Sequence, residues 1–285
     1  MTTKAQKLRD LINSGEHFIA ADVYSAITGK IVEHVGFQAA YLGGHACSAF
    51  HYAMPDYGVY SQVEQLEQAN RIAEAMEIPL IADADTLGET VADAFHFTRR
   101  YVKSDVAGYH VEDGINPRHS TFVGDLQPIA EMQAKLDACV KARGDSPFVI
   151  IARCDELYPK SYRGAGDCSM ETAIQRGLAY AEAGADVMLY PFANQEACDA
   201  LRAALPIPVC VLGPVVPGTA FALHTGWGWM GAAQLHLKNA RELMETGSVT
   251  GFDPTMPEKA EFLEMGLYDD LIRDWAKKTG KPFRD

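Results

Sequence analysis

The chain has 285 residues, of which 48% are hydrophobic and 22% are charged. These ordinary proportions exclude disorder, collagen-like repeats and a small disulfide scaffold. Its 38 acidic residues outnumber 25 basic ones, and the resulting net charge of -13 argues against binding to nucleic acids or to anionic membrane surfaces. An anionic substrate is still allowed, because a local arginine or metal ion can reverse the field inside one pocket.

The six cysteines are scattered without the spacing of a metal finger or a redox pair. This pattern predicts reduced thiols and a cytoplasmic protein. The N-terminus alternates charged and apolar side chains at helical spacing and lacks the apolar core of a signal peptide. No apolar run approaches the roughly 18 residues of a membrane helix. We therefore expect a soluble chain that does not enter the membrane.

Short apolar runs recur along the chain, each followed by a polar or glycine-containing stretch and then by a helical pattern. Such runs, apolar without strict alternation, are typical of parallel strands that are buried on both faces. The runs begin at His17, Ala39, Pro79, Ala107, Phe148, Ala185 and Pro208. An eighth strand gives the weakest signal, and we place it in the glycine- and tryptophan-rich segment 223–236.

Eight units of strand and helix in 285 residues leave about 36 residues for each unit, which fits a closed barrel better than an open sheet. We therefore predict an α/β fold, a (β/α)8 TIM barrel, as one domain over residues 1–285. The apolar pattern of the tail, 251–285, predicts a C-terminal extension of two short amphipathic helices. Their apolar faces pack either on the same barrel or on a neighbouring subunit.

Acidic residues end two neighbouring strands, at the rim where sites are built in this fold. Asp83 and Asp85 lie two residues apart and so point to the same side, and Glu112 ends the next strand. Three carboxylates without histidine or cysteine favour a hard cation, Mg2+ or Mn2+. Alternatively, each aspartate caps the helix that follows its strand.

Arg153 ends the fifth strand after four apolar residues. Its guanidinium either clamps a substrate carboxylate with two parallel hydrogen bonds or bridges Asp155 or Glu112. Gly43 and Gly44 follow the second strand and either leave their amides free for an anion or form a tight turn.

Two long polar segments, 114–127 and 158–170, follow the fourth and fifth strands. Unstructured loops of this length are often lids. In the first segment, Arg118, His119 and Ser120 are placed to close over a substrate and to exclude water.

Six short motifs occur together between about Phe18 and Glu196. They are A-D-V-Y-S at 21–25, Y-L-G-G at 41–44, M-P-D-Y at 54–57, D-A-D-T at 83–86, H-V-E-D at 110–113 and A-R-C-D at 152–155. In this combination the chain resembles the isocitrate lyase and phosphoenolpyruvate mutase superfamily. The resemblance implies a (β/α)8 barrel whose last helix is exchanged between subunits of a homotetramer, a dimer of dimers.

The resemblance also implies a metal site and a substrate site. Mg2+ or Mn2+ would bind through Asp85, with Asp83 and Glu112 nearby or bound through water, and Asp56 would assist the metal shell. The substrate carboxylate and its enolate oxygen would be held by Gly43, Gly44 and Arg153.

The sequence departs from the superfamily where the chemistry is selected. Isocitrate and methylisocitrate lyases carry a K-K/R-C-G-H loop motif with a catalytic cysteine, whereas Ser120 stands nearest that position here. A serine hydroxyl has too high a pKa to replace a thiolate at pH 7. The loop asparagine of the phosphonopyruvate branch is also missing, since Asn116 lies four residues early. After the sixth strand, Tyr190 replaces the usual Glu or His, as a proton donor or as a buried structural residue.

We therefore predict a Mg2+-dependent lyase that cleaves a carbon–carbon bond of a 2-oxo or 2-hydroxy carboxylate, resembling oxaloacetate or methylisocitrate, through an enolate that the metal stabilises. The alternatives are an oxaloacetate-type decarboxylase or hydrolase, a phosphonopyruvate mutase or hydrolase, and a barrel without catalytic activity. The candidate catalytic residues are Arg153, Glu112, Ser120 and His119. The candidate substrate-binding residues are Tyr41, Gly43, Gly44, Asp56, Arg153 and Tyr190, and the candidate metal ligands are Asp83, Asp85 and Glu112.

Overall fold

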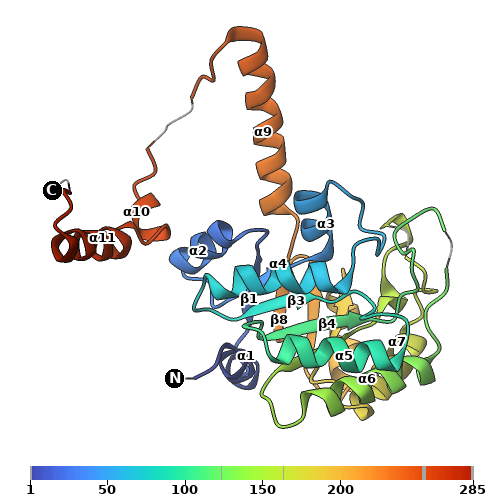
Figure 1. Cartoon of the computed structure of the whole chain (residues 1–285). Coiled ribbons are helices and arrows are strands. Elements are labelled where there is room, and N and C mark those ends of the chain that lie inside the picture. Colours follow the sequence, from blue (N-terminus) through green and yellow to red (C-terminus); the bar gives the residue numbers. More distant parts are fainter. Residues whose placement is uncertain (1, 123, 163, 252–254, 284–285) are drawn as a thin grey trace. The chain divides into compact units, whose positions relative to one another are not determined.

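Eight parallel strands close into a ring in which β1 to β8 follow one another in chain order (Figure 1). The computed structural model describes residues 2–122, 124–162, 164–251 and 255–283. Within them the last strand pairs with the first, from Phe18 with Phe221 to Ala21 with His224. The predicted (β/α)8 TIM barrel is confirmed. The strands are Phe18–Asp22, Ala39–Leu42, Leu80–Asp83, Gly108–Glu112, Val149–Arg153, Val187–Pro191, Val209–Leu212 and Phe221–His224.

Polar caps start several of the helices that follow the strands. Ser25, Ser61 and Thr90 each form a capping box, in which the side chain accepts a backbone N–H and the third helical residue returns the bond. The helices α1 to α8 are Lys4–Asn13, Ala26–Val35, Gly44–Tyr52, Gln62–Glu74, Val91–Val102, Ile129–Arg143, Met170–Glu182 and Gln195–Ala204. Two single-turn helices, η1 (Asp155–Leu157) and η2 (Lys160–Tyr162), follow β5.

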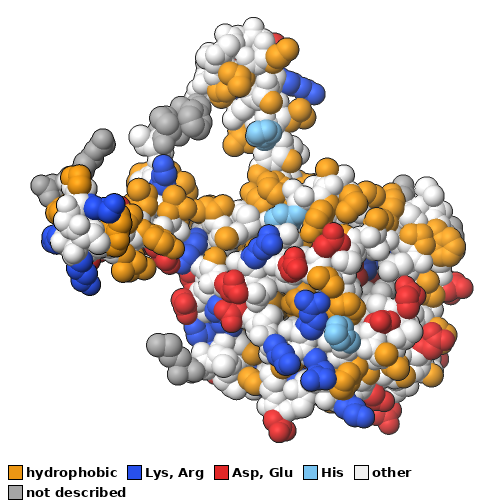
Figure 2. Space-filling view, viewed as in Figure 1, with side chains coloured by type: hydrophobic (Ala, Val, Ile, Leu, Met, Phe, Trp, Pro, Cys, Tyr) orange, Lys and Arg blue, Asp and Glu red, His pale blue; other side chains and the backbone are white. Residues whose placement is uncertain are grey.

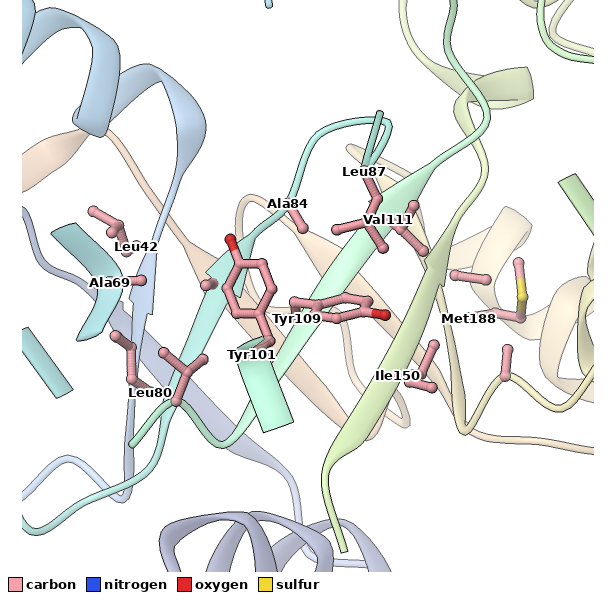
Figure 3. Packing of buried hydrophobic residues seen from close by; sticks show 14 of the residues in the cluster. Leu42, Ala69, Leu80, Ala84, Leu87, Tyr101, Tyr109, Val111, Ile150 and Met188 are labelled. Atoms are coloured by element: carbon pink, nitrogen blue, oxygen red, sulfur yellow. The ribbon is translucent and has the colours of Figure 1, made fainter. Parts of the chain in front are cut away.

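Strand residues alternate between two separate cores. On β5, Val149 and Ile151 belong to the cluster inside the barrel, whereas Ile150 and Ala152 belong to the cluster between the strands and the helices. Figure 3 shows part of this outer layer, with Ile150 among the labelled side chains. Because successive side chains of a strand point to opposite faces, Arg153 continues the inward-facing row at the carboxyl end.

The N-terminal helix α1 closes the other end of the barrel. Leu8 is fully buried within the inner cluster, and a Cβ on Gly108 would lie 3.2 Å from its side chain. Arg9 donates from Nε to the carbonyl of Pro147 and from Nη2 to that of Phe148. The open mouth is therefore at the carboxyl ends of the strands.

The eighth strand differs from its prediction. β8 begins at Phe221, two residues before the predicted segment, and most of that segment belongs to helix α9 (Trp227–Thr246). The turn between them passes through Gly226, whose φ of 91° is in the region that favours glycine. The tryptophan-rich stretch is thus helical rather than extended.

The chain divides into two compact units, Met1–Ala232 with the barrel and Ala233–Asp285. The second unit contains the two short helices predicted for the tail, α10 (Lys259–Phe262) and α11 (Met265–Thr279). The exposed apolar side chains of α11 include Leu267, Leu271, Ile272 and Trp275. Figure 2 shows hydrophobic side chains, in orange, on the surface of this helix. Among the described residues, no helix is both long and apolar enough to cross a membrane.

Candidate active site

The strand ends bring charged side chains to one buried position. Asp83, Glu112 and Arg153 end β3, β4 and β5, and each is less than 5% exposed. Neighbouring strands hold them in register, with Glu112 beside Arg153 and Asp83 beside His110. The structure brings these three residues together at the barrel mouth, where the sequence predicted them.

The carboxylate of Asp83 is held by backbone amides. Its Oδ2 accepts the amide of Gly44 at 2.9 Å, and its Oδ1 accepts that of Asp85 at 2.8 Å. Gly44 is the first residue of α3, so the helix dipole favours the negative charge at this point. A Cβ on Gly44 would lie 2.8 Å from the same carboxylate. The Gly44 amide is therefore engaged, and the prediction that it is free for a substrate is wrong.

The guanidinium of Arg118 lies among three acidic side chains. It pairs with Asp85 and with Glu112 and donates from Nη2 to Asp56 Oδ1 at 3.2 Å. Arg118 comes from the segment between β4 and α6 and is only 7% exposed. The Gly114–Leu126 bridge and the bond from Gln127 to the Asp113 carbonyl pin the base of this segment. The predicted lid residue thus reaches into the carboxylate cluster.

Burial and pairing set the charges of this cluster. Burial raises the pKa of Asp85 well above its ordinary value, although Arg118 opposes the change. Burial also acts to raise the pKa of Glu112, but Arg118 and Arg153 outweigh it and lower that pKa. Arg118 favours the ionised form of both carboxylates. It prevails at Glu112, whereas burial prevails at Asp85.

Arg153 makes both of the bridges considered from the sequence. Its Nε and Nη2 donate to Asp155 at 2.7 and 3.0 Å, and its Nη1 lies 2.9 Å from Glu112 Oε2. The guanidinium carbon lies 5.5 Å from the centroid of the Tyr158 ring, a cation–π distance. These contacts fix the guanidinium at the cavity wall, where it also borders the open space.

Two further side chains behind the glycine pair are linked by a hydrogen bond. Tyr41 Oη lies 2.8 Å from His110 Nε2, and both residues are buried. Burial, with help from Arg153, lowers the pKa of His110 to about 3, so its ring is neutral at pH 7. His110 lies in the sequence motif but had no predicted role. A role in the site could have been predicted from its position on β4, two residues before Glu112 and therefore on the same inward face.

A buried network behind the site holds Asp155 in place. Asp113 follows Glu112 and therefore points outward, where its Oδ1 accepts the Asp155 amide at 2.9 Å. Its Oδ2 accepts from Tyr180 at 2.8 Å and from Arg176 at 3.2 Å, both on α7. Sequence reasoning did not identify Arg176 or Tyr180, because nothing local links them to the strand ends.

A cavity of about 660 Å³ opens above these residues. It is bordered by Tyr41, Gly43, Gly44, His45, Asp56, Asp83, His119 and Arg153, and on its other side by Tyr158, Tyr162, Phe192, Leu212, Pro214, His224, Trp229 and Met230. The ring of His119 lies 5.2 Å from that of Tyr158, and burial lowers the pKa of this histidine. His119 thus borders the cavity with its ring beside that of Tyr158.

Four predicted site residues do not border this cavity, namely Asp85 and Glu112, which pair with Arg118, and Tyr190 and Ser120. Tyr190 points away from the barrel interior, and its hydroxyl donates to the Ala173 carbonyl of α7 at 2.9 Å. This follows from the alternation on β6, where Leu189 takes the inward position. The Ser120 hydroxyl donates to the Pro117 carbonyl at 2.6 Å and accepts from the amide two residues later. It borders another cavity, of about 450 Å³, together with other residues of this loop.

In the arrangement seen in this structure, the carboxylates of the site fit a hard divalent cation only in part. Among the described residues, no three His, Cys, Asp or Glu side chains are grouped to hold a metal ion. The reason is visible in the contacts, because the Arg118 guanidinium takes oxygens of Asp85, Glu112 and Asp56. A cation that is held by three carboxylates shows that the position selects positive charge and offers oxygen ligands. The cluster therefore offers the oxygen donors that a hard divalent cation prefers, with the Arg118 guanidinium in contact with them in this structure.

The sequence comparison gives the family. Residues 8–228 match the family described as phosphoenolpyruvate phosphomutase. The chain belongs to this family. The match covers every strand of the barrel and each of the acidic residues described above, so the resemblance inferred from the six motifs is confirmed.

Curated members of the phosphoenolpyruvate phosphomutase family differ in their named activities. The chain is 34% identical over 186 residues to 2,3-dimethylmalate lyase from Eubacterium barkeri, which is 65% of this chain and 62% of that protein. It is 35% identical over 191 residues to phosphonopyruvate hydrolase from Variovorax sp. (strain Pal2), 66% of this chain and 63% of that protein. The chain thus spans less than two thirds of the length of these relatives.

Solved structures of the family agree over nearly the whole chain. Phosphonopyruvate hydrolase in complex with oxalate and Mg2+ has a TM-score of 0.80 at 25% identity, covering 98% of this chain and 100% of that chain. Oxaloacetate acetylhydrolase with 3,3-difluorooxalacetate has a TM-score of 0.84 at 24% identity, covering 99% of each chain. At that identity the second likeness establishes the fold alone.

Proposed function

We propose that the protein is a Mg2+-dependent lyase that cleaves a carbon–carbon bond of a 2-oxo or 2-hydroxy carboxylate through an enolate. One observation carries this proposal. A group of carboxylates that holds a guanidinium lies next to Arg153, and Arg153 borders a cavity together with Asp56 and Asp83. This combination suits a substrate with a carboxylate and an adjacent oxygen, on which negative charge develops when the neighbouring bond breaks.

The metal ion would be held by Asp85, with Asp83, Glu112 and Asp56 nearby. When bound, Mg2+ or Mn2+ supplies a Lewis acid for the oxygen that gains charge. Asp83 keeps its place through the Gly44 amide. The Arg118 guanidinium, which fills the cluster in this conformation, would return to the loop and cover the cavity.

The remaining residues bind the substrate and move protons. Arg153 binds the substrate carboxylate, because Asp155 and Glu112 fix its orientation before the substrate arrives. Tyr41, hydrogen-bonded to the neutral His110, holds a proton near the enolate oxygen. His119 takes the hydroxyl proton of the substrate or protonates the enolate carbon left when the carbon–carbon bond breaks, in place of the cysteine of the isocitrate lyases. It borders the cavity, whereas the adjacent Ser120 hydroxyl is turned into its own loop.

Replacement of Asp85 tests the metal site. We expect Asp85→Ala to lower Mg2+-dependent turnover by about 10³-fold or more and to abolish saturable Mg2+ binding in calorimetry. Asp125→Ala, on the exposed part of the same loop, is the matched control and should behave as the unchanged protein. Turnover comes from a mass-spectrometric screen of 2-oxo and 2-hydroxy acids with Mg2+ present. Retained metal dependence in Asp85→Ala would contradict the proposed site.

A second candidate is cleavage of the carbon–phosphorus bond of phosphonopyruvate. The 35% identity to phosphonopyruvate hydrolase favours it, and it would use the same cation and arginine. The two reactions are separated by ³¹P spectra after incubation with phosphonopyruvate. An unchanged phosphonate signal excludes this candidate. Release of phosphate would instead favour carbon–phosphorus cleavage over the carbon–carbon lyase reaction.

We also propose that the protein is a cytoplasmic homotetramer whose last helix is exchanged between subunits. The six free thiols support a reducing compartment. The exposed apolar side chains of α11, such as Leu271 and Trp275, support burial against a partner copy. Light scattering of the full chain should give four times the monomer mass. Leu271→Glu should shift this towards smaller assemblies.

A further inference from the structure

Helix α7 carries a guanidinium that contacts the candidate site from behind. Arg176 Nη1 donates to Asp113 Oδ2 at 3.2 Å and to the Gln127 carbonyl at 2.9 Å. The same nitrogen donates to Tyr180 Oη, four residues later on the helix, at 2.9 Å. The Arg176 side chain is only 11% exposed, and it is not among the described residues that border the cavity. Any effect of Arg176 on a ligand must therefore pass through its partners.

The first of these partners connects Arg176 to the arginine of the cavity wall. The Asp113 amide donates to the Arg153 carbonyl at 3.2 Å. The Asp113 carboxylate accepts the Asp155 amide at 2.9 Å, and Asp155 accepts two hydrogen bonds from the Arg153 guanidinium. Asp113 thus holds the chain on both sides of Cys154. The position of its carboxylate determines the direction of the Arg153 guanidinium.

The second partner closes the base of the loop between β4 and α6, which carries His119. The Gln127 amide donates to the Asp113 carbonyl at 2.8 Å, and its side-chain Nε2 donates to the Gly114 carbonyl at 3.0 Å. Arg176 takes the backbone carbonyl of the same glutamine. Both ends of this loop are therefore tied together at one place, next to the Arg176 guanidinium.

The loop between β5 and α7 is tied down beside the same guanidinium. Glu156 Oε1 accepts the amides of Asp167 and Ser169 at 3.0 and 3.1 Å, and Ser169 caps α7. Arg176 Nε lies 4.0 Å from Glu156 Oε2, at the limit of an ion pair. Tyr158, two residues after this glutamate, borders the cavity. One guanidinium thus lies at the base of both loops that contribute to the cavity.

The pairing of Asp113 makes its position sensitive to Arg176. Its side chain is fully buried, and within the described part of the chain Arg176 is the only cation paired with it. A buried carboxylate that loses its cation is strongly disfavoured, so the carboxylate should shift towards other donors when Arg176 is removed. Its hydrogen bond to the Asp155 amide would change, and the Arg153 guanidinium would lose its fixed direction.

We propose that Arg176 is a positioning residue, which sets the affinity of the site for the substrate carboxylate by fixing Arg153 and the bases of the two loops. This inference rests on the proposed function, in which Arg153 binds that carboxylate. A site that is ordered before its ligand arrives binds more tightly, because less conformational freedom is lost on binding.

Oxalate binding measures this effect without turnover. Calorimetry on the full chain with saturating Mg2+ would compare Arg176→Met with the unchanged protein. We expect oxalate to bind about tenfold more weakly or worse, as when a residue that supports a metal ligand is replaced. Mg2+ alone should bind within about twofold of its unchanged affinity, because the proposed metal ligands are not partners of Arg176. Arg202→Met, which breaks an exposed pair on α8, is the matched control and should leave both affinities unchanged.

The results separate positioning from a merely structural role. If Arg176→Met binds oxalate as tightly as the unchanged protein, the inference is overturned and the proposed function stands. If the affinities for oxalate and for Mg2+ fall by the same factor, Arg176 only maintains the fold around the site, and the inference is again overturned. If the unchanged protein does not bind oxalate in the presence of Mg2+, the proposed function fails and the inference fails with it.

A conservative variant tests the hydrogen bonds themselves. An ammonium group has three N–H donors, and Arg176 uses a single nitrogen for its three acceptors. Arg176→Lys should therefore restore the oxalate affinity to within about threefold of that of the unchanged protein. An affinity as low as that of Arg176→Met would mean that these bonds do not set it.

A milder variant decides the question if Arg176→Met does not fold by circular dichroism. Tyr180→Phe removes the hydroxyl that donates to Asp113 at 2.8 Å and accepts from Arg176. Oxalate should then bind about threefold more weakly or worse, again with unchanged Mg2+ affinity. Unchanged oxalate affinity in Tyr180→Phe would overturn the inference in that case.

Discussion

The two halves of the barrel mouth follow the same strand geometry but end in different chemistry. On β3, β4 and β5 the inward-facing rows finish at Asp83, Glu112 and Arg153. On β6 and β7 the inward-facing residues near the mouth are Leu189 and Leu212. The first half holds charges that pair with one another, and the second half leaves apolar surface open to the cavity.

This difference predicts which half of the mouth controls activity and which half controls ligand preference. The polar half costs stability, because buried carboxylates need a cation and every guanidinium must be paired. It is therefore the half in which single substitutions should have large effects on activity. The apolar half has no such network, and substitutions there should change which ligand is preferred more than whether any ligand binds.

Replacement of Arg153, on the polar half, gives the largest expected effect. Arg153→Lys keeps the charge but cannot donate to Asp155 twice while pairing with Glu112. We expect kcat/KM to fall by about 10²–10³-fold, measured with the substrate from the mass-spectrometric screen. Arg202→Lys, whose pair with Asp199 is exposed, should leave kcat/KM unchanged. A change of less than threefold in Arg153→Lys would remove this residue from the substrate site.

The pH dependence of stability tests the buried carboxylate at the end of β1. Burial raises the pKa of Asp22 from 3.8 to about 6, against the opposing effect of hydrogen bonds from Gly228 and Gly226. A raised folded-state pKa means that the protonated form favours folding. This contribution is fully present below pH 3.8 and is lost as the pH rises through about 6, a change of at most about 3 kcal/mol.

Asp22→Asn removes this titration. The unfolding free energy of the variant minus that of the unchanged protein should therefore rise by about 2–3 kcal/mol between pH 3.8 and pH 7. Urea denaturation at both pH values measures it, and the difference cancels the other titrating groups. Asp145→Asn, at an exposed position, should show no such rise. A flat difference for Asp22→Asn would mean that burial does not raise this pKa.

Competition at the cation position should be visible as a gain of affinity. Arg118 and a divalent cation require the same oxygens of Asp85, Glu112 and Asp56. We expect Arg118→Met to tighten Mg2+ binding by about tenfold, equivalent to about 1.4 kcal/mol, in calorimetry without substrate. Arg273→Met, with an exposed pair in the second unit, is the control. Weaker binding in Arg118→Met would instead make Arg118 a support for the metal site.

The smallest effect is expected at a residue that faces away from the apolar half. Tyr190→Phe loses one hydrogen bond to the Ala173 carbonyl, so the free energy of unfolding should fall by about 1 kcal/mol. Its kcat/KM should change by less than twofold. Denaturation and steady-state kinetics measure the two effects. A large loss of kcat/KM without a loss of stability would return Tyr190 to the list of proton donors.

Much of the fold was readable because each buried parallel strand is a continuous apolar run. The signal failed at β8, since Phe221–His224 is short and is followed at once by Trp227 in a helix. The acidic residues at the strand ends could be predicted because each one directly follows such an apolar run. The two-residue period places Asp83, the last residue of β3, inward, and the neighbouring strand brings Glu112 to the same mouth. Asp85 lies beyond the strand with a left-handed φ of 49°, so its place beside Glu112 does not follow from the period.

The remaining parts of the site depend on contacts between distant segments. The period of two, applied to β6, places Tyr190 outward opposite Leu189, so this error was avoidable. By contrast, no local pattern shows that the Gly44 amide is taken by Asp83 or that Arg118 inserts among the carboxylates. A loop side chain has no period from which its direction can be read. Only the folded arrangement reveals which of several loop residues reaches the cluster.

The bond between Asp22 and the turn after β8 has a consequence for how the chain is made. Gly226, which donates to this carboxylate, lies 204 positions later in the sequence. During synthesis the first strand therefore waits with an open edge until nearly the whole barrel has emerged, and open strand edges invite pairing with other chains. The ring closes through contacts of high sequence separation, which is slow. A nascent chain interrupted before Phe221 would leave one edge of β1 open and Asp22 without the donors of the turn after β8.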